Sequence, residues 1–211
     1  MSSKLRTALL VAVPIVIEAL LELERGYNNG RRTDDPMERG RAPFALVIGK
    51  IAGGHYETVT AGDVTIKGGT YFSPVVGDVV DVMDAFRDAI AKANGSDDFL
   101  RRNPAQLEFL HHDDSTRQSP QIPLAQHMGE VLSRRGGAGA AVPGPFCCDM
   151  RHLVNQGGIP TIIFGPGTIA QAHKPDEHIN IDEYLDSIGH LIEFIWHWCN
   201  QDAEPAKKLR A

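Results

Sequence analysis

The stretch that most constrains the fold is residues 158–184, where an apolar run leads into a glycine turn and a polar loop. The run Ile159–Phe164 is β-branched and bounded by Gly and Pro, which predicts a buried strand. Gly165-Pro166-Gly167 predicts a turn whose backbone N–H groups can approach a ligand closely. A buried strand that brings such a turn and His173 to the carboxyl end of a sheet is typical of α/β ligand sites. By position alone, an ordinary loop histidine is the simpler interpretation of His173.

The composition bounds the class of protein. A chain of 211 residues, 42% hydrophobic and 23% charged, is typical of a globular protein with one large domain or two small ones. The net charge of -6 and the absence of a basic stripe argue against nucleic acid as a partner. The early apolar run is too short to span a bilayer, so no membrane partner is expected. Three cysteines, two of them adjacent, predict no disulfide framework and hence a reducing compartment, the cytoplasm.

Apolar periodicity predicts an α-β-β-α-β order over roughly the first 115 residues. Polar loops and Pro74 separate these elements. The expected elements are a helix over residues 3–25 kinked at Pro14, strands over 44–51 and 63–72, a helix over 78–93 capped by Asp78, and a short strand over 106–110.

The rest of the chain predicts two more amphipathic helices on either side of the strand at 159–164. The Gly/Ala/Pro-rich run between them and the first part predicts a flexible connector. The expected elements are a helix over 123–134, a connector over 136–145, a turn or short helix over 148–155, and a long helix over 181–199 capped by Asp182.

Three further groups of residues have side chains that could ligate a metal, and each has a simpler interpretation. His111-His112-Asp113-Asp114 follows a predicted strand, where consecutive residues point to opposite faces, so a solvated strand end is favoured over a metal site. Cys147-Cys148-Asp149 lacks the C-x-x-C spacing of a structural zinc site. His190 and His197 are seven residues apart and hence on one helix face, but they lie among Trp196, Trp198 and Ile195, which favours core or helix-surface packing. Motifs for a nucleophile elbow, a P-loop and a dinucleotide fold are absent, so spacing alone gives no complete catalytic set.

Three segments together resemble one family. GIPTIIFGPGTIAQAHKPDEHINIDEY at 158–184 resembles the carboxyl-terminal signature of the co-catalytic zinc hydrolases, which include acetylornithine deacetylase, succinyl-diaminopimelate desuccinylase, aminoacylase and glutamate carboxypeptidase. CDMRHLVNQGGIP at 148–160 resembles the family's Asp-Ala-Arg block, and GKIAGGHYETV at 49–59 its Gly-Gly segment. The similarity extends over residues 3–199 and is most specific over 158–184.

The resemblance implies an α/β fold in two parts. Residues 1–115 correspond to the dimerisation (lid) domain, an α+β, ferredoxin-like α-β-β-α-β unit that lacks the family's first strand. Residues 116–200 correspond to the last segment of the α/β catalytic domain, and 201–211 form a polar tail. In the family, the sheet edges of the lid pair across a homodimer, so a homodimer through the lid is one expected partner arrangement.

The resemblance also assigns site residues. His173 matches the last zinc ligand, which implies zinc or another divalent metal as cofactor, and Glu177 matches an acid that would orient that ligand. The assigned residues beside the substrate are Gly165 and Gly167, and those of the lid segment are Gly53, Gly54, His55 and Thr58. The family's carbonyl-polarising Asn falls on Thr58, and a family Arg falls on Tyr71, so the lid departs from the family pattern at both positions.

The family's other zinc ligands and its general-base Glu precede the lid and have no counterpart in this sequence. One ligand cannot hold a zinc pair, because a catalytic zinc needs about three protein ligands. The expected function is therefore a truncated or split metal-dependent amidohydrolase or peptidase that cleaves the amide bond of N-acyl amino acids or small peptides. It would be inactive, and bind no zinc tightly, without a complementing amino-terminal half. The alternative is a non-catalytic dimerisation or regulatory module that pairs with a full-length family member; a fragment with no independent role is a third interpretation. A chain with this many missing strand neighbours is also expected to be poorly soluble, oligomeric or partly disordered when alone.

Overall fold

The computed structural model describes residues 3–29, 42–59, 61–144 and 146–200. The chain forms two compact units. The amino-terminal unit comprises Met1–Arg117 with Pro143–Cys148, and the carboxyl-terminal unit comprises Gln118–Val142 with Asp149–Ala211. Both helices and strands are present, so the chain is a mixed α/β protein, as predicted.

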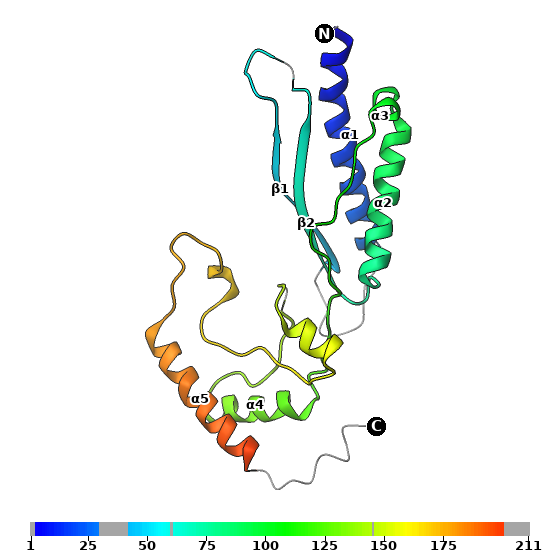
Figure 1. Ribbon diagram of the computed structural model, residues 1–211. Coiled ribbons are helices and arrows are strands. Elements are labelled where there is room, and N and C mark those ends of the chain that lie inside the picture. The colour runs from blue at the N-terminus through cyan, green and yellow to red at the C-terminus, as the bar shows by residue number, and fades with distance from the viewer. Residues whose placement is uncertain (1–2, 30–41, 60, 145, 201–211) are drawn as a thin grey trace. The chain divides into compact units, whose positions relative to one another are not determined.

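The amino-terminal unit is a β-hairpin beside two long helices (Figure 1). Strands β1 and β2 pair antiparallel, from Phe44 opposite Phe72 to Gly53 opposite Val64, with an irregularity between Ile48 and Lys50. Helices α1 and α2 pack against each other. The elements in chain order are α1 (Ser3–Asn28), β1 (Phe44–Gly53), β2 (Val64–Phe72), α2 (Val79–Ser96) and α3 (Asp98–Arg102).

Phe44, at the start of β1, is the centre of this unit's core. It is fully buried, and the rings of Tyr27 and Phe86 lie 4.6 Å and 6.3 Å from it, centroid to centroid. The Asn28 side chain donates to the Phe44 carbonyl at 2.9 Å and accepts from the Phe44 N–H at 3.2 Å. Both backbone groups of Phe44 are therefore satisfied by the end of α1, which fixes where β1 begins.

Helix α2 begins as predicted, at a cap on Asp78. The Asp78 side chain accepts from the Asp81 N–H at 2.9 Å, and the Asp81 side chain accepts from the Asp78 N–H at 3.4 Å. Such a capping box satisfies two of the N–H groups that a helix start leaves unpaired. The Asp114 side chain accepts from a third, the Val79 N–H, at 2.6 Å.

The predicted strand over 106–110 is wrong, because that segment is not in a sheet. Side chains of α2 hold it instead of a strand neighbour. Asn94 exchanges two hydrogen bonds with the backbone of Ala105, at 2.8 Å and 3.0 Å. The Phe109 ring packs edge-on against Phe86 at 6.3 Å, with the Arg87 guanidinium 5.2 Å from its centroid. An apolar alternation predicts which residues face the core, but it does not show whether a partner strand is present.

In the carboxyl-terminal unit, α4 and α5 pack on each other. Val131 of α4 is fully buried, and the His127 ring lies 5.3 Å from Phe194 and 5.9 Å from Trp198. Glu193 of α5 accepts from Arg134 at 2.8 Å and Arg135 at 3.0 Å. The elements are α4 (Pro123–Arg134), the π-helical turn η1 (His152–Gln156), the 3-10 turn η2 (Ile169–Gln171) and α5 (Ile181–Cys199).

Two predictions about this unit are wrong. The segment Ile159–Phe164 is not a strand and is not buried, since Ile159 and Ile163 are each 52% exposed. Within the described residues it pairs with no other strand. The cap of α5 is Asn180 rather than Asp182: the Asn180 side chain accepts from the N–H groups of Asp182 at 2.8 Å and Glu183 at 3.3 Å.

The helices predicted over 3–25, 78–93, 123–134 and 181–199 and the strands over 44–51 and 63–72 are confirmed to within a few residues at their ends. Helix α1 continues through Pro14. Of the helices that the structure describes, none is at once long and apolar enough to cross a membrane.

Candidate functional site

The loop that follows residues 159–164 contains most of the predicted site residues. It begins with Gly165-Pro166-Gly167, where Gly167 has φ +85°, the left-handed region that favours glycine. A Cβ on Gly167 would lie 3.7 Å from Ile179, an ordinary contact, so backbone conformation rather than space requires glycine here. The Gly167 N–H donates to the Glu183 carboxylate at 3.2 Å. The turn is therefore tied to the first turn of α5.

His173 lies after η2, in an unusual backbone conformation. Its φ is +63°, and among the described residues no other non-glycine residue has a positive φ. An L-residue there costs roughly 1–2 kcal/mol, and such strain is found preferentially at functional sites. The His173 N–H donates to the Glu177 carboxylate at 3.1 Å, which holds the strained backbone in place. The side chain is exposed.

The structure therefore places four predicted site residues, Gly165, Gly167, His173 and Glu177, in one loop. Glu177 holds the backbone of His173 rather than its ring. The sequence predicted an acid that orients His173, and the contact seen orients the residue through its main chain.

The lid segment belongs to the other unit, at the tip of the β1–β2 hairpin. Gly54 has φ +76°, and a Cβ on Gly53 would lie 2.5 Å from the Asp63 carbonyl oxygen, too close for any side chain. The hairpin therefore requires both glycines for backbone reasons. His55 and Thr58 are exposed beyond them.

The residues described do not make a zinc site. In the described part of the chain no three His, Cys, Asp or Glu side chains are grouped closely enough to hold a metal ion. Among the described residues His173 therefore belongs to no group of three such side chains, and a catalytic zinc needs about three. We therefore assign no metal-dependent step to these residues alone.

The other polar clusters have structural contacts. Asp114 caps α2, so the run at 111–114 is in part a helix-capping loop; it is exposed, but it does not end a strand. The interpretation of His190 and His197 as packing residues is confirmed by ring contacts, at 6.2 Å to Phe164 and 6.2 Å to His127 respectively.

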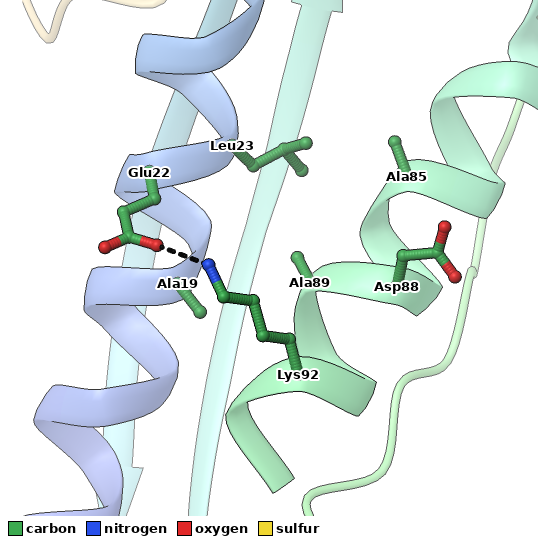
Figure 2. Close-up of a pocket in the computed structure, with 7 residues that line it drawn as sticks. All are labelled: Ala19, Glu22, Leu23, Ala85, Asp88, Ala89 and Lys92. Carbon is green, nitrogen blue, oxygen red and sulfur yellow. Dashed lines mark hydrogen bonds and ion pairs between the residues drawn. The ribbon is translucent and has the colours of Figure 1, made fainter. Parts of the chain in front are cut away.

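A groove of about 380 Å³ lies between α1 and α2 in the amino-terminal unit (Figure 2). Lys92 extends from α2 toward Glu22 of α1, with 3.2 Å between Nζ and Oε2. Three of the lining residues are alanine and one is leucine, and Lys92 is already engaged in the ion pair with Glu22. The groove therefore presents little chemistry for recognising a ligand. Its lining residues are Ala19, Glu22, Leu23, Ala85, Asp88, Ala89 and Lys92.

Two carboxyl groups outside the site have lowered pKa values. Hydrogen bonds from Arg135 and then Arg134 lower the pKa of Glu193. A hydrogen bond from Arg101, together with its charge, lowers the pKa of Asp98. Both acids stabilise helices and lie outside the loop that carries His173.

Sequence reasoning missed Glu183 and Asn180. The sequence did contain a signal for both residues, because Asn is a common helix cap and acidic residues are common in the first turn of a helix. Nothing in the sequence, however, indicates that Glu183 reaches back 16 residues to Gly167.

Comparison with known proteins matches the chain to a family model. Residues 15–197 match the model described as peptidase family M20/M25/M40. The acetylornithine deacetylase of Edwardsiella ictaluri is 31% identical over 97 residues, which cover 46% of this chain and 24% of that protein. The N-formyl-4-amino-5-aminomethyl-2-methylpyrimidine deformylase of Halalkalibacterium halodurans is 40% identical over 45 residues, 21% of this chain and 10% of that protein.

The [LysW]-lysine hydrolase of Deinococcus radiodurans is 25% identical over 87 residues, 41% of this chain and 24% of that protein. The chain thus spans a quarter or less of the length of these curated relatives. The family assignment rests on the family model, which covers most of the chain. This chain belongs to peptidase family M20/M25/M40, a family of metal-dependent amidohydrolases and peptidases.

Proposed function

We propose that this chain supplies the lid and one wall of the active site of a metal-dependent amidohydrolase. The substrate class is an N-acyl amino acid or a small peptide, cleaved at its amide bond. Activity requires a complementing amino-terminal half that brings the remaining ligands and the general base. His173 is the residue of this chain that would bind the metal.

The conformation of His173 carries the proposal. Its backbone is held at φ +63° by the Glu177 carboxylate, while its exposed ring makes no hydrogen bond within the part of the chain that the structure describes. A strained backbone with an available imidazole fits a metal ligand better than a packing histidine.

The apolar surface of α5 supports the need for a second polypeptide. The side chains that recur at helical spacing on one side of α5 are between 39% (Ile188) and 72% (Ile181) exposed. A contiguous apolar surface of this kind marks an interaction site. The nearby run Ile159–Phe164 is also apolar, and within the described residues it pairs with no strand, so a second polypeptide could supply the neighbour it lacks. The exposed α5 residues are Ile181, Tyr184, Leu185, Ile188, Leu191, Ile192, Ile195 and Trp196.

Complementation tests the proposal. The coding sequence upstream is expected to carry H-x-D-x-x-P and a Glu-Glu pair, and its product should be co-expressed with this chain. The complex is expected to hydrolyse N-acetyl amino acids. His173→Ala should lower kcat/KM by more than the roughly 10–100-fold typical of a lost outer-shell partner.

His178→Ala is the matched control, because His178 is an exposed histidine in the same loop whose Nδ1 lies 2.7 Å from the Asp176 carbonyl oxygen. Equal losses in the two variants, or full activity of His173→Ala, would contradict the assignment. Equilibrium dialysis of the chain alone is expected to show no stoichiometric tight zinc. Tight zinc that is lost in His173→Ala would show that the site is complete without a second polypeptide.

The alternative function is a non-catalytic dimerisation or regulatory module. It is favoured by the hairpin, whose strands β1 and β2 each have one edge without a strand partner within the described residues. Side chains of α1 bond Phe44 and Leu46 on the edge of β1, so β2 has the more open edge. Open edges of this kind pair readily with another chain. This function predicts a complex with a purified full-length family member whose formation and activity are unchanged by His173→Ala. Sedimentation and an activity assay on that variant therefore separate the two functions.

A further inference from the structure

We propose that Glu183 is a positioning residue that fixes the Gly165–Gly167 turn beside His173. The importance of the turn rests on the function proposed above, but the contact and its test do not. Glu183 lies in the first turn of α5, and its carboxylate accepts from the Gly167 N–H at 3.2 Å.

The carboxylate is placed by a fixed part of the chain. Asn180 caps α5 by accepting from the N–H groups of Asp182 and Glu183, so the first turn of the helix has a defined start. Since Glu183 is on this turn, its side chain reaches Gly167 from a rigid element.

The loop contains two contacts of this kind, each between a backbone N–H and a carboxylate. The residues with positive φ between 165 and 178 are Gly167 and His173, at +85° and +63°. Each donates its N–H to a carboxylate, Gly167 to Glu183 and His173 to Glu177. Neither belongs to a helix or strand, so no regular ladder specifies these two conformations. The two carboxylates specify them instead.

The contact also orients a carbonyl. The peptide bond between Pro166 and Gly167 is trans, so its N–H and C=O groups point in opposite directions. Because the N–H faces Glu183, the Pro166 carbonyl faces away from the first turn of α5. Loss of Glu183 would leave this peptide plane free to turn.

A simpler explanation competes with this one. Acids in the first turn of a helix are stabilising because of the helix dipole, whatever they touch. Charge alone would then account for Glu183. The two explanations differ in whether the length of the side chain matters.

Amide hydrogen exchange by NMR, on the full chain, separates them. Glu183→Gln keeps the side-chain length and an acceptor oxygen but removes the charge. Glu183→Asp keeps the charge but is shorter by one methylene. We expect Glu183→Asp to speed exchange at Gly167 on the order of 5-fold, the size of one net hydrogen bond, and Glu183→Gln to change it less.

Asp182→Ala is the control, because it removes a neighbouring acid from the same turn and should leave exchange at Gly167 unchanged. The opposite result would overturn the proposal in favour of the helix dipole: exchange at Gly167 at the wild-type rate in Glu183→Asp and faster exchange in Glu183→Gln. An equal increase in Asp182→Ala would overturn it too, as would unchanged exchange in Glu183→Asp. Because no partner, metal or substrate is present, failure of the complementation experiment leaves this result unaffected.

Discussion

The two units of this chain cover their apolar helix faces to different extents. In the amino-terminal unit Phe44, Val76 and Val82 are buried together with Phe86 of α2 packed against them, and α2 also buries Ile90 and Ala93. In the carboxyl-terminal unit α5 is the more apolar helix, yet of its residues only Ser187 is buried. An amphipathic pattern therefore shows that a face is made to be covered, and within the described residues the apolar face of α5 is left largely exposed.

The largest effect should come from the covered core. Phe44→Ala removes a fully buried ring and is expected to lower the free energy of unfolding by about 3–5 kcal/mol. Val47→Ala, on the same strand at a position 47% exposed, should cost much less. Denaturant unfolding monitored by circular dichroism measures both. Similar losses for the two variants would mean that β1 is not anchored as described.

A substitution on the exposed apolar face of α5 should change self-association rather than the free energy of unfolding. Ile192→Lys replaces a side chain that is 65% exposed, so helix content should change little and the free energy of unfolding by less than about 0.5 kcal/mol. Sedimentation should show weaker association of the isolated chain. Val131→Lys, at a fully buried position of α4, is the contrasting variant and should unfold this unit. A strong loss of stability in Ile192→Lys would show that α5 is already covered.

Two helical glycines offer a finer comparison between the units. A Cβ on Gly95 of α2 would meet no atom within 4 Å, so Gly95→Ala should stabilise by roughly 0.5–1 kcal/mol through helix propensity. A Cβ on Gly189 of α5 would lie 2.9 Å from Arg135 Nη1, so that guanidinium must move away. Gly189→Ala should therefore gain less. Thermal unfolding compares them, and an equal gain would show that Arg135 moves at no cost.

The smallest effects concern pH. The lowered pKa of Glu193 means that its stabilisation is present above the unfolded value near 4.5 and is lost as pH falls through the folded value. Since Glu193 joins α4 to α5, unfolding of the carboxyl-terminal unit should become easier below that pH, and Glu193→Gln should remove this part of the pH dependence. Asp98 has a lowered pKa through its neighbour Arg101 in the same short helix, so Asp98→Asn should affect only α3. Denaturant titrations between about pH 3 and pH 7, the range set by carboxyl pKa values, measure the stability of both variants. An identical pH dependence in Glu193→Gln and Asp98→Asn would contradict the different roles given to the two acids.

Local signals explain why much of the fold could be predicted from the sequence. Helix α2 carries both its apolar period and its capping acid within a few residues, and the hairpin carries its glycines at the turn. The segments 106–110 and 159–164 were predicted wrongly because strand formation depends on a neighbour, which a segment's own residues do not reveal.

The candidate site was predictable only in part. Resemblance to a family indicated His173 and Glu177, and the structure adds the backbone strain at His173. The resemblance could not indicate that Glu183 reaches Gly167, since that contact depends on how α5 folds back toward the turn. The shift of the α5 cap from Asp182 to Asn180 was missed for a local reason: both residue types cap helices well, and the backbone decides which of the two is the cap.

The Asn28–Phe44 contact also has a practical use. Its two hydrogen bonds, at 2.9 Å and 3.2 Å, join the last residue of α1 to the first residue of β1. The amide hydrogen of Phe44 therefore reports, through its exchange rate, whether the end of α1 and the start of β1 remain joined. Such a probe needs no change to the sequence and no label on either residue.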